Sequence, residues 1–288
     1  MSNLILGVDA GNHRAKVAGP YGVDSYRTAI CDWFARDIVE SFGAGDDMEF
    51  EVNGRKGYAG TIAAYEDQFG GGAMYGDSKA HEDTLIRVLL AIYRYTDKYC
   101  PGERRVSIVT GQPIATHNEA EKARIIDMLR AEHVFTVNGE RQRIIIEEVG
   151  VAAEGAGAFW ANPRMGLVRS MDPGSGTFNC ATIIDKRFIN NASSTFNFGI
   201  ETVSDPSDME SIARGMIRSA TRLKYQRNDY VSICGGSANE LHPYIIKHFP
   251  ATEVLSPILR HVDGGVSVLE PVYGNAVGFY NIAKAKYR

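Results

Sequence analysis

Short apolar runs alternate along the chain with longer stretches in which apolar residues recur every three or four positions. The runs, such as Leu4–Val8 and Val106–Val109, have the length and composition of buried strands. The longer stretches, such as His81–Lys98, place their apolar side chains on one face of a helix. Strands and helices that alternate in this way are typical of an α/β fold.

Turn and cap signals divide these elements. Asn53-Gly54 and Asn138-Gly139 each lie between apolar runs, and both predict tight β-hairpins. A Ser or Thr three residues before a Glu predicts the start of a helix at Thr116 and again at Ser207. The Ala- and Gly-rich stretch Val151–Phe159 predicts a closely packed helix, and the Gly-rich stretch 68–79 predicts a loop.

One pattern occurs twice. Leu4–Val8 leads into Asp9-Ala10-Gly11-Asn12 and a second apolar run, and Leu167–Met171 leads into Asp172-Pro173-Gly174 and the run Phe178–Ile184. Each half later contains another strand that runs into glycine. Two similar halves that face each other enclose a cleft, and clefts between domains are where ligands usually bind.

Each repeat combines a carboxylate at the end of a strand with a glycine-rich turn. Such a turn lets successive N–H groups converge on an anion, and a carboxylate beside it can hold Mg²⁺ through water. One such hairpin is weak evidence, because any tight turn can contain these residues. The pair predicts a triphosphate gripped from both sides. The candidate residues of the two loops are Gly11, Asn12, Lys16, Gly174, Ser175, Gly176 and Thr177.

Three further features carry candidate chemistry. Gly235-Gly236-Ser237 follows a strand and opens a helix, where a flat ring or a phosphate can approach closely. Glu147-Glu148 ends an apolar run, and such a carboxylate either orients a water molecule or is simply solvated. The basic helix edge with Arg214 and Arg218 is either a solvated face or a contact for a polymer or a nucleotide.

Composition narrows the function classes. The net charge of −4 gives no basic field for direct DNA binding. The chain has no GxxxxGK[ST] loop, which argues against a P-loop NTPase. Its seven histidines show no metal-ligand spacing, which argues against a zinc site. The four widely spaced cysteines indicate free thiols in a reducing cytoplasm, and we expect no signal peptide and no membrane segment.

These motifs, in this order, resemble those of the actin, Hsp70 and sugar-kinase superfamily. The matches are two phosphate loops at Asp9–Lys16 and Asp172–Thr177, connecting segments at Ile145–Ala153 and Asn275–Tyr280, and an adenosine motif at Ile233–Ala238. They span nearly the whole chain. The resemblance implies ATP and Mg²⁺ as cofactors. It also implies that Asp9 and Asp172 hold the metal through water, and that Glu148, or its neighbour Glu147, positions the attacking water.

Within the superfamily, the chain is most similar to bacterial plasmid-segregation actins of the ParM/StbA group. The resemblance implies two duplicated, ribonuclease H-like domains. Domain I comprises residues 1–160 and 273–288, with subdomain IB at about 28–80, and domain II comprises residues 161–272. Relatives carry an extra subdomain IIB, but only about 40 residues separate Phe196 from Gly236. We therefore expect IIB to be absent or vestigial, as in AlfA-type relatives, with Arg214 or Arg218 replacing its contacts to adenine.

The resemblance also implies a function. It predicts an ATPase that polymerises into a polar filament of identical subunits and segregates plasmid DNA through a DNA-binding adaptor at the plasmid centromere. A small-molecule kinase of the same superfamily is the alternative, and a nucleotide-sensing module without useful turnover is a third reading.

Overall fold

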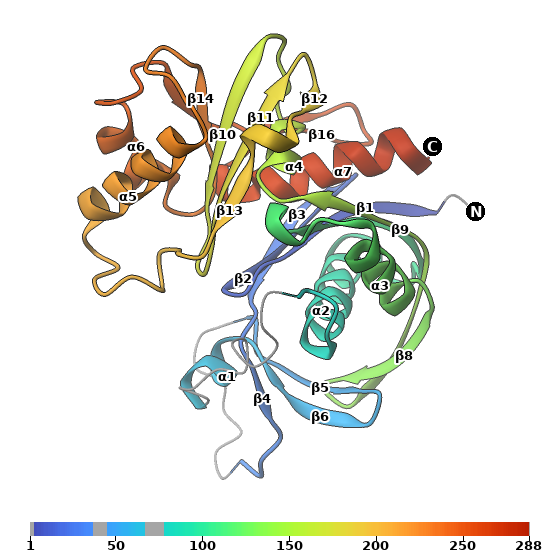
Figure 1. The fold of residues 1–288 in the computed structure, drawn as a ribbon. Coiled ribbons are helices and arrows are strands. Elements are labelled where there is room, and N and C mark those ends of the chain that lie inside the picture. The colour runs from blue at the N-terminus through green and yellow to red at the C-terminus, as the bar shows by residue number, and fades with distance from the viewer. Residues whose placement is uncertain (1–2, 37–44, 67–77, 288) are drawn as a thin grey trace.

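The computed structural model describes residues 3–36, 45–66 and 78–287, and it confirms the α/β class. Two β-sheets lie side by side, each with its own helices (Figure 1). The loop predicted for residues 68–79 lies almost entirely outside the described residues. Every helix in the described part of the chain is too short or too polar to cross a bilayer.

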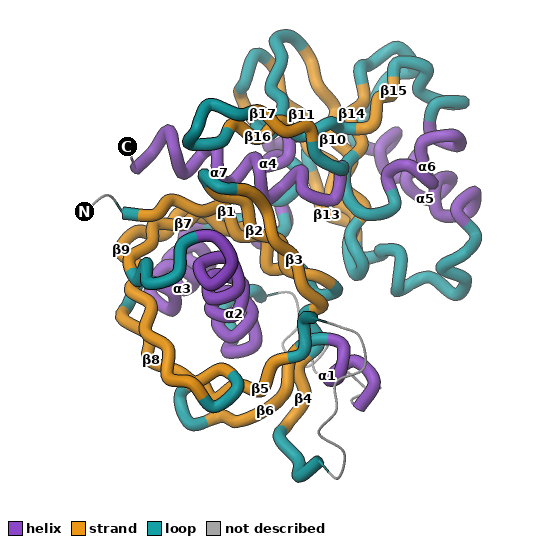
Figure 2. Tube along the Cα trace, turned by 180° about the vertical axis from the view of Figure 1, so that it is seen from behind, coloured by secondary structure: helices purple, strands orange, loops and turns teal. Residues whose placement is uncertain are grey.

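Within the described residues, nine strands form the first sheet, in the order β3-β2-β1-β7-β9-β8-β5-β6-β4. The sheet curves around α2 and α3 (Figures 1 and 2). Both Asn-Gly turns are confirmed, at the ends of β5–β6 and β8–β9. The strands are β1 Leu4–Ala10, β2 Arg14–Gly19, β3 Gly22–Arg27, β4 Ile30–Asp32, β5 Met48–Val52, β6 Arg55–Ala59, β7 Arg105–Gln112, β8 Glu132–Val137 and β9 Glu140–Ala153.

The second sheet has the order β12-β11-β10-β14-β15, with β13 also paired to β11. Its strands are β10 Leu167–Pro173, β11 Phe178–Ile184, β12 Arg187–Phe188, β13 Ser194–Phe196, β14 Val231–Ile233 and β15 Thr252–Val254. A separate hairpin joins β16 Ile258–Arg260 to β17 Val266–Val268.

The internal repeat seen in the sequence is present in the sheets. In the first, β1 is antiparallel to β2 and parallel to β7, which is parallel to β9. In the second, β10 is antiparallel to β11 and parallel to β14, which is parallel to β15. The two predicted phosphate hairpins are therefore the β1–β2 and β10–β11 turns, at equivalent places in the two sheets.

The helices cover the sheets in layers. Helices α2 and α3 pack inside the curved first sheet, and α5 and α6 pack on one face of the second. Helices α4 and α7 lie between the sheets (Figure 1). The bounds are α1 Thr61–Glu66, α2 Glu82–Tyr99, α3 Glu119–Leu129, α4 Ala156–Phe159, α5 Met209–Arg222, α6 Ala238–Ile245 and α7 Gly274–Tyr287. The 3₁₀ turns are η2 Ile114–Thr116, η3 Asn190–Ala192 and η4 Pro271–Tyr273.

Backbone packs directly on backbone where α7 crosses its neighbours. A Cβ atom at Gly278 would lie 1.9 Å from the carbonyl oxygen of Gly157 in α4. A Cβ atom at Gly7 in β1 would lie 2.2 Å from the carbonyl oxygen of Ala276 in α7. Because these glycines have no side chains, α7 packs closely on β1 of the first sheet and on α4 between the sheets.

The predicted helix starts need correction. Asn118, not Thr116, caps α3 by accepting a hydrogen bond from the Glu121 amide, because Thr116 still belongs to η2. Asp208, not Ser207, caps α5 by accepting from the Ser211 amide. A carboxylate or amide oxygen closer to the helix takes the capping role in both cases.

The helix predicted for Val151–Phe159 is wrong over its first half. Strand β9 continues to Ala153, paired in parallel with β7, and only Ala156–Phe159 is helical. Residues 197–208, which connect β13 to α5, form no helix or strand. The domain boundaries and the loss of subdomain IIB stay predictions.

The α4–α7 crossing predicts that Gly278→Ala destabilises the protein by roughly 3 kcal/mol, because the added methyl meets backbone that cannot move away without separating the helices. Gly215→Ala in α5 is the matched control. Its Cβ would meet only Phe198, at 3.7 Å. Alanine suits a helix interior better, so this change should stabilise by about 0.5–1 kcal/mol. Urea unfolding measures the change in the free energy of unfolding for both variants. Equal changes would contradict the idea that the α4–α7 crossing requires glycine.

Candidate functional site

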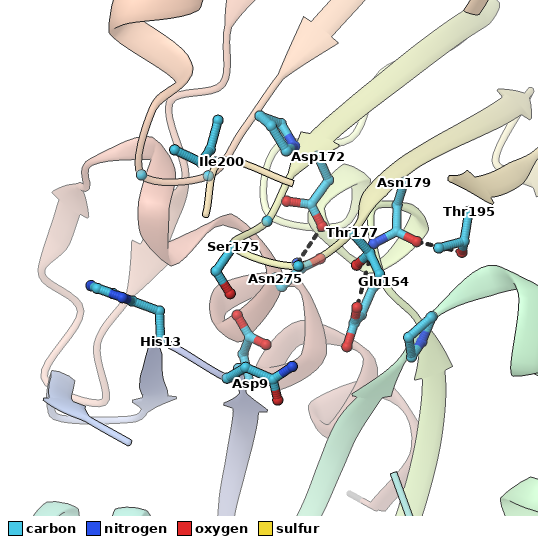
Figure 3. Close-up of a pocket in the computed structure, with 18 of the residues that line it drawn as sticks. Asp9, His13, Glu154, Asp172, Ser175, Thr177, Asn179, Thr195, Ile200 and Asn275 are labelled. Atoms are coloured by element: carbon cyan, nitrogen blue, oxygen red, sulfur yellow. Dashed lines mark hydrogen bonds between the residues drawn. The ribbon is translucent and has the colours of Figure 1, made fainter. Parts of the chain in front are cut away.

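A cavity of about 600 Å³ opens between the two sheets, lined from both sides by the β1–β2 and β10–β11 turns (Figure 3). Every residue predicted for the two phosphate loops, the metal and the third glycine motif lines it, whereas Glu148 does not. These residues are Asp9, Gly11, Asn12, Lys16, Asp172, Gly174, Ser175, Gly176, Thr177, Gly235, Gly236 and Ser237. Arg214 and Arg218, proposed from the sequence as adenine contacts, are not among the lining residues.

The first hairpin holds a buried ion pair at its base. Asp9 and Lys16 are cross-strand partners, and the Lys16 ammonium donates to the Asp9 carboxylate at 3.1 Å. Burial disfavours the charged form of Lys16, but the charge and hydrogen bond of Asp9, together with the charges of Asp172 and Glu154, outweigh burial and raise the pKa of Lys16. Asn12, in the turn, accepts a hydrogen bond from buried Arg87. The cation and the turn are therefore fixed before any ligand enters.

The second hairpin places Asp172 at the end of β10, 7% exposed. Asn275 of α7 donates to its carboxylate at 2.9 Å and accepts from the Gly155 amide at 3.1 Å. The pKa of Asp172 is raised to about 6, chiefly by burial and also by the charges of Glu154 and Asp9, against the lowering effects of the Asn275 hydrogen bond and the Lys16 charge. This carboxyl group is thus held where its negative charge is unfavourable.

A short segment after β13 packs on the second phosphate loop. The Ile200 and Glu201 amides donate to the carbonyl oxygens of Gly174 and Ser175, at 3.0 and 2.9 Å. A Cβ atom at Gly199 would lie 2.3 Å from the Ser175 oxygen, so only glycine fits this approach. Glu201 also forms an ion pair across the cavity with His13 of the first hairpin.

The third glycine motif lies beside Asp172. Gly235 has a φ of +91°, and its Cβ atom would lie 2.9 Å from the Pro173 carbonyl oxygen. Glycine is required there on both counts. Helix α6 begins at Ala238 directly after this turn, and Gly236 leaves open space beside Val272. The turn lines the cavity together with Asp172.

The structure does not bring Glu148 to the cavity. Strand β9 runs on for five residues beyond it, so Glu148 is exposed on the strand and Glu147 pairs with Arg105. The carboxylate that follows the true end of β9 is Glu154, 8% exposed, and it lines the cavity. The structure therefore places Glu154, in the turn between β9 and α4, at the cavity where the sequence led us to expect Glu148.

Three polar residues that surround Glu154 were not predicted. Lys79 lies 3.4 Å from Glu154 and donates to the Ala10 carbonyl oxygen at 3.1 Å. Asn179 donates to the other Glu154 oxygen, and Thr195 donates to Asn179 (Figure 3). The alternation of β11 gave a usable signal for Asn179, because it is a polar residue in an otherwise apolar run. Lys79 and Thr195 carry no local signal.

The residues present fit a magnesium–nucleotide better than a metal held by protein alone. No group of three or more His, Cys, Asp or Glu side chains among the described residues could hold a metal ion. Asp9, Asp172 and Glu154 nevertheless line one cavity together with Lys16. Mg²⁺ keeps several waters when it accompanies phosphates, and carboxylates that bind those waters suffice.

Two sheets of the same strand order, each lending a glycine-rich hairpin to one cleft, define an actin-like fold. A family model described as the N-terminal domain of actin-like proteins matches residues 7–157, and the chain belongs to this family.

Solved structures share the fold. The AlfA filament from B. subtilis plasmid pLS32 is 19% identical, with a TM-score of 0.76 and coverage of 96% of this chain and 97% of that one. An AlfA filament bound to AMPPNP is 18% identical, with a TM-score of 0.75 and full coverage of both chains. Apo psk41 ParM is 16% identical, with a TM-score of 0.73 and coverage of 99% and 98%. No curated protein matches the sequence.

Asp172 yields a stability prediction. Its pKa is raised from 3.8 to about 6, so the folded protein resists ionisation of this group more than the unfolded chain does. The resulting destabilisation is absent below pH 3.8 and complete above about pH 6. Asp172→Asn, which can still accept from Asn275, should stabilise the ligand-free protein by up to about 3 kcal/mol at pH 7.

Unfolding of Asp172→Asn at pH 7 and at acidic pH measures this effect. The gain should shrink as the pH falls, since the native carboxyl group is then protonated. Asp97→Asn, on the exposed side of α2, is the control and should change stability little at either pH. A loss of stability for Asp172→Asn at pH 7 would refute the account of the site's electrostatics.

Proposed function

We propose that this protein is a magnesium-dependent ATPase whose nucleotide cycle drives the assembly of a polar filament. The observation that carries the proposal is the pair of carboxylate–glycine hairpins, at Asp9 and Asp172, that line one cavity from opposite sheets. An anion with several phosphates suits this arrangement, because two turns and Lys16 approach it from different directions.

Each part of the cavity has a proposed task. The turns at Gly11–Asn12 and Gly174–Thr177 bind the phosphates, and Gly235–Ser237 bind the nucleoside. Asp9 and Asp172 bind the waters of Mg²⁺, and the metal when bound supplies charge neutralisation at the phosphates. Glu154 orients the attacking water and accepts its proton, as a carboxylate within reach of a reacting water does in general base catalysis.

The proposal extends to assembly. The AlfA relatives are filaments, and one of them is bound to AMPPNP. We propose the same for this chain, with a head-to-tail contact between identical subunits, because such a contact that does not close on itself gives an open filament. Release of phosphate then weakens the subunit contact by favouring a different arrangement of the two halves.

The cellular role follows from the same relatives. We propose that the filament lies in the cytoplasm and segregates plasmid DNA. The net charge of −4 favours an adaptor protein, not the filament itself, as the molecule that binds the centromere DNA. Loss of a plasmid when the filament and adaptor genes are both deleted, with rescue only when both proteins are supplied, would support this role.

Assembly gives the first direct test. Purified protein should sediment and scatter light with MgATP or MgAMPPNP, and filaments should be visible by electron microscopy, whereas MgADP gives less polymer. Asp172→Ala removes a carboxylate from the phosphate site and should abolish nucleotide-dependent sedimentation. Failure to assemble with either nucleotide at any protein concentration would contradict the filament, and phosphorylation of a small acceptor without assembly would favour a kinase.

A matched pair of variants tests the hydrolytic residue. Glu154→Gln should lower the turnover of ATP by about 10²- to 10⁴-fold while nucleotide still binds, because the amide cannot accept the proton of the water. Glu148→Gln makes the same chemical change on the exposed part of β9 and should leave turnover unchanged. Phosphate release measures both. A loss of turnover in Glu148→Gln but not in Glu154→Gln would support Glu148, the residue expected from the sequence.

A further inference from the structure

The carboxylate of Glu154 is held by a chain of side chains that passes between the two sheets. Ala115 belongs to η2, which follows β7 of the first sheet, and its amide donates to the Thr195 hydroxyl of β13 at 3.1 Å. Thr195 donates to the Asn179 side chain of β11 at 2.6 Å. Asn179 donates to Glu154, at 3.4 Å, back on the first half of the chain.

The hydrogen bonds in this chain have one consistent direction. The Thr195 oxygen accepts from the Ala115 N–H, so its single hydrogen is free to donate to the Asn179 amide oxygen. The Asn179 NH₂ group must then face Glu154, since a turned amide would set two oxygens against each other. Asn179 is 2% exposed, so its orientation depends on these partners and not on bulk water.

Both oxygens of Glu154 are thereby engaged. Lys79 lies on one oxygen and Asn179 on the other, and the carboxylate is nearly enclosed. Lys79 reaches Glu154 from the segment just before α2 and also donates to the Ala10 carbonyl oxygen beside Asp9. These two contacts restrain the rotation of the carboxylate. A group that orients one water molecule needs such a restraint.

We propose that Thr195 is a positioning residue for hydrolysis: anchored on Ala115, it orients Asn179 and, through it, the Glu154 carboxylate. The inference rests on the proposed role of Glu154. It makes hydrolysis depend on the contact between η2 and β13, so the carboxylate is fully aligned only while the two halves of the protein lie together at this edge. Nucleotide binding does not require the chain of hydrogen bonds.

The experiment compares two substitutions at one position. Thr195→Val keeps the shape and removes the hydroxyl, and it should lower kcat for MgATP by about 10- to 100-fold while KM and MgAMPPNP affinity stay within about twofold of the parent. Thr195→Ser keeps the hydroxyl and should restore turnover. Ser194→Ala, the preceding residue on β13, is the control and should behave as the parent.

Double variants test whether Thr195, Asn179 and Glu154 act in series, because their effects on kcat should then not add. Asn179→Ala should lower kcat as Thr195→Val does, and the double variant should be no slower than Asn179→Ala alone, because the two residues act in series. In Glu154→Gln, Thr195→Val should have no further effect. An additive loss, an unchanged kcat for Thr195→Val, a serine variant as slow as the valine variant, or a change in KM alone would each overturn the inference.

The outcomes separate this inference from the function on which it rests. If the parent protein hydrolyses no ATP, or Glu154→Gln is fully active, the proposed role of Glu154 fails. If the parent is active and Glu154→Gln is not, but Thr195→Val matches the parent, only the positioning role of Thr195 fails. Sedimentation with MgAMPPNP checks that each variant is folded and assembles.

Discussion

The crossing of α4 and α7 is the constraint on which the site depends. Glycine at 157 and 278 lets the two helices touch backbone to backbone between the sheets. One helical turn earlier on α7, Asn275 reaches Asp172 with one end of its amide and the Gly155 backbone with the other. The element that joins the two halves therefore also orients the second phosphate hairpin, and a shift at the crossing is transmitted directly to the cleft.

The charged side chains of the cavity favour a ligand that combines a cation with an anion. Three carboxylates, Asp9, Asp172 and Glu154, line one cavity, and the ammonium groups of two partly buried lysines, Lys16 and Lys79, partly offset their charge. Burial leaves the pKa of Asp172 raised to about 6 even so. The hydrated Mg²⁺ of the proposed function would relieve this repulsion, and the phosphates of its nucleotide would pair with the two lysines. Neither a metal cation alone nor a phosphate anion alone suits these side chains as well as the two bound together.

Local patterns made the β1–β2 and β10–β11 hairpins predictable, because Asp9 and Asp172 each end an apolar strand before a glycine turn. Glu154 was missed because the acidic pair before Val149 interrupts the apolar run and resembles the end of a strand, whereas β9 continues beside β7. The small residues of that continuation also mimic a helix. Thr195 contacts Ala115, which lies 80 residues away in the sequence, and no local pattern encodes such a contact. The caps were missed by one or two residues, where several polar side chains compete.

Asn275 has a further consequence for protein synthesis. A nascent chain that has not yet reached α7 lacks both the amide that orients Asp172 and the helix that joins the sheets. Both hairpins precede α7 along the chain, but the helix that joins their sheets follows all the other described elements. If the proposed function holds, a chain that still lacks α7 should neither capture nucleotide nor join a filament.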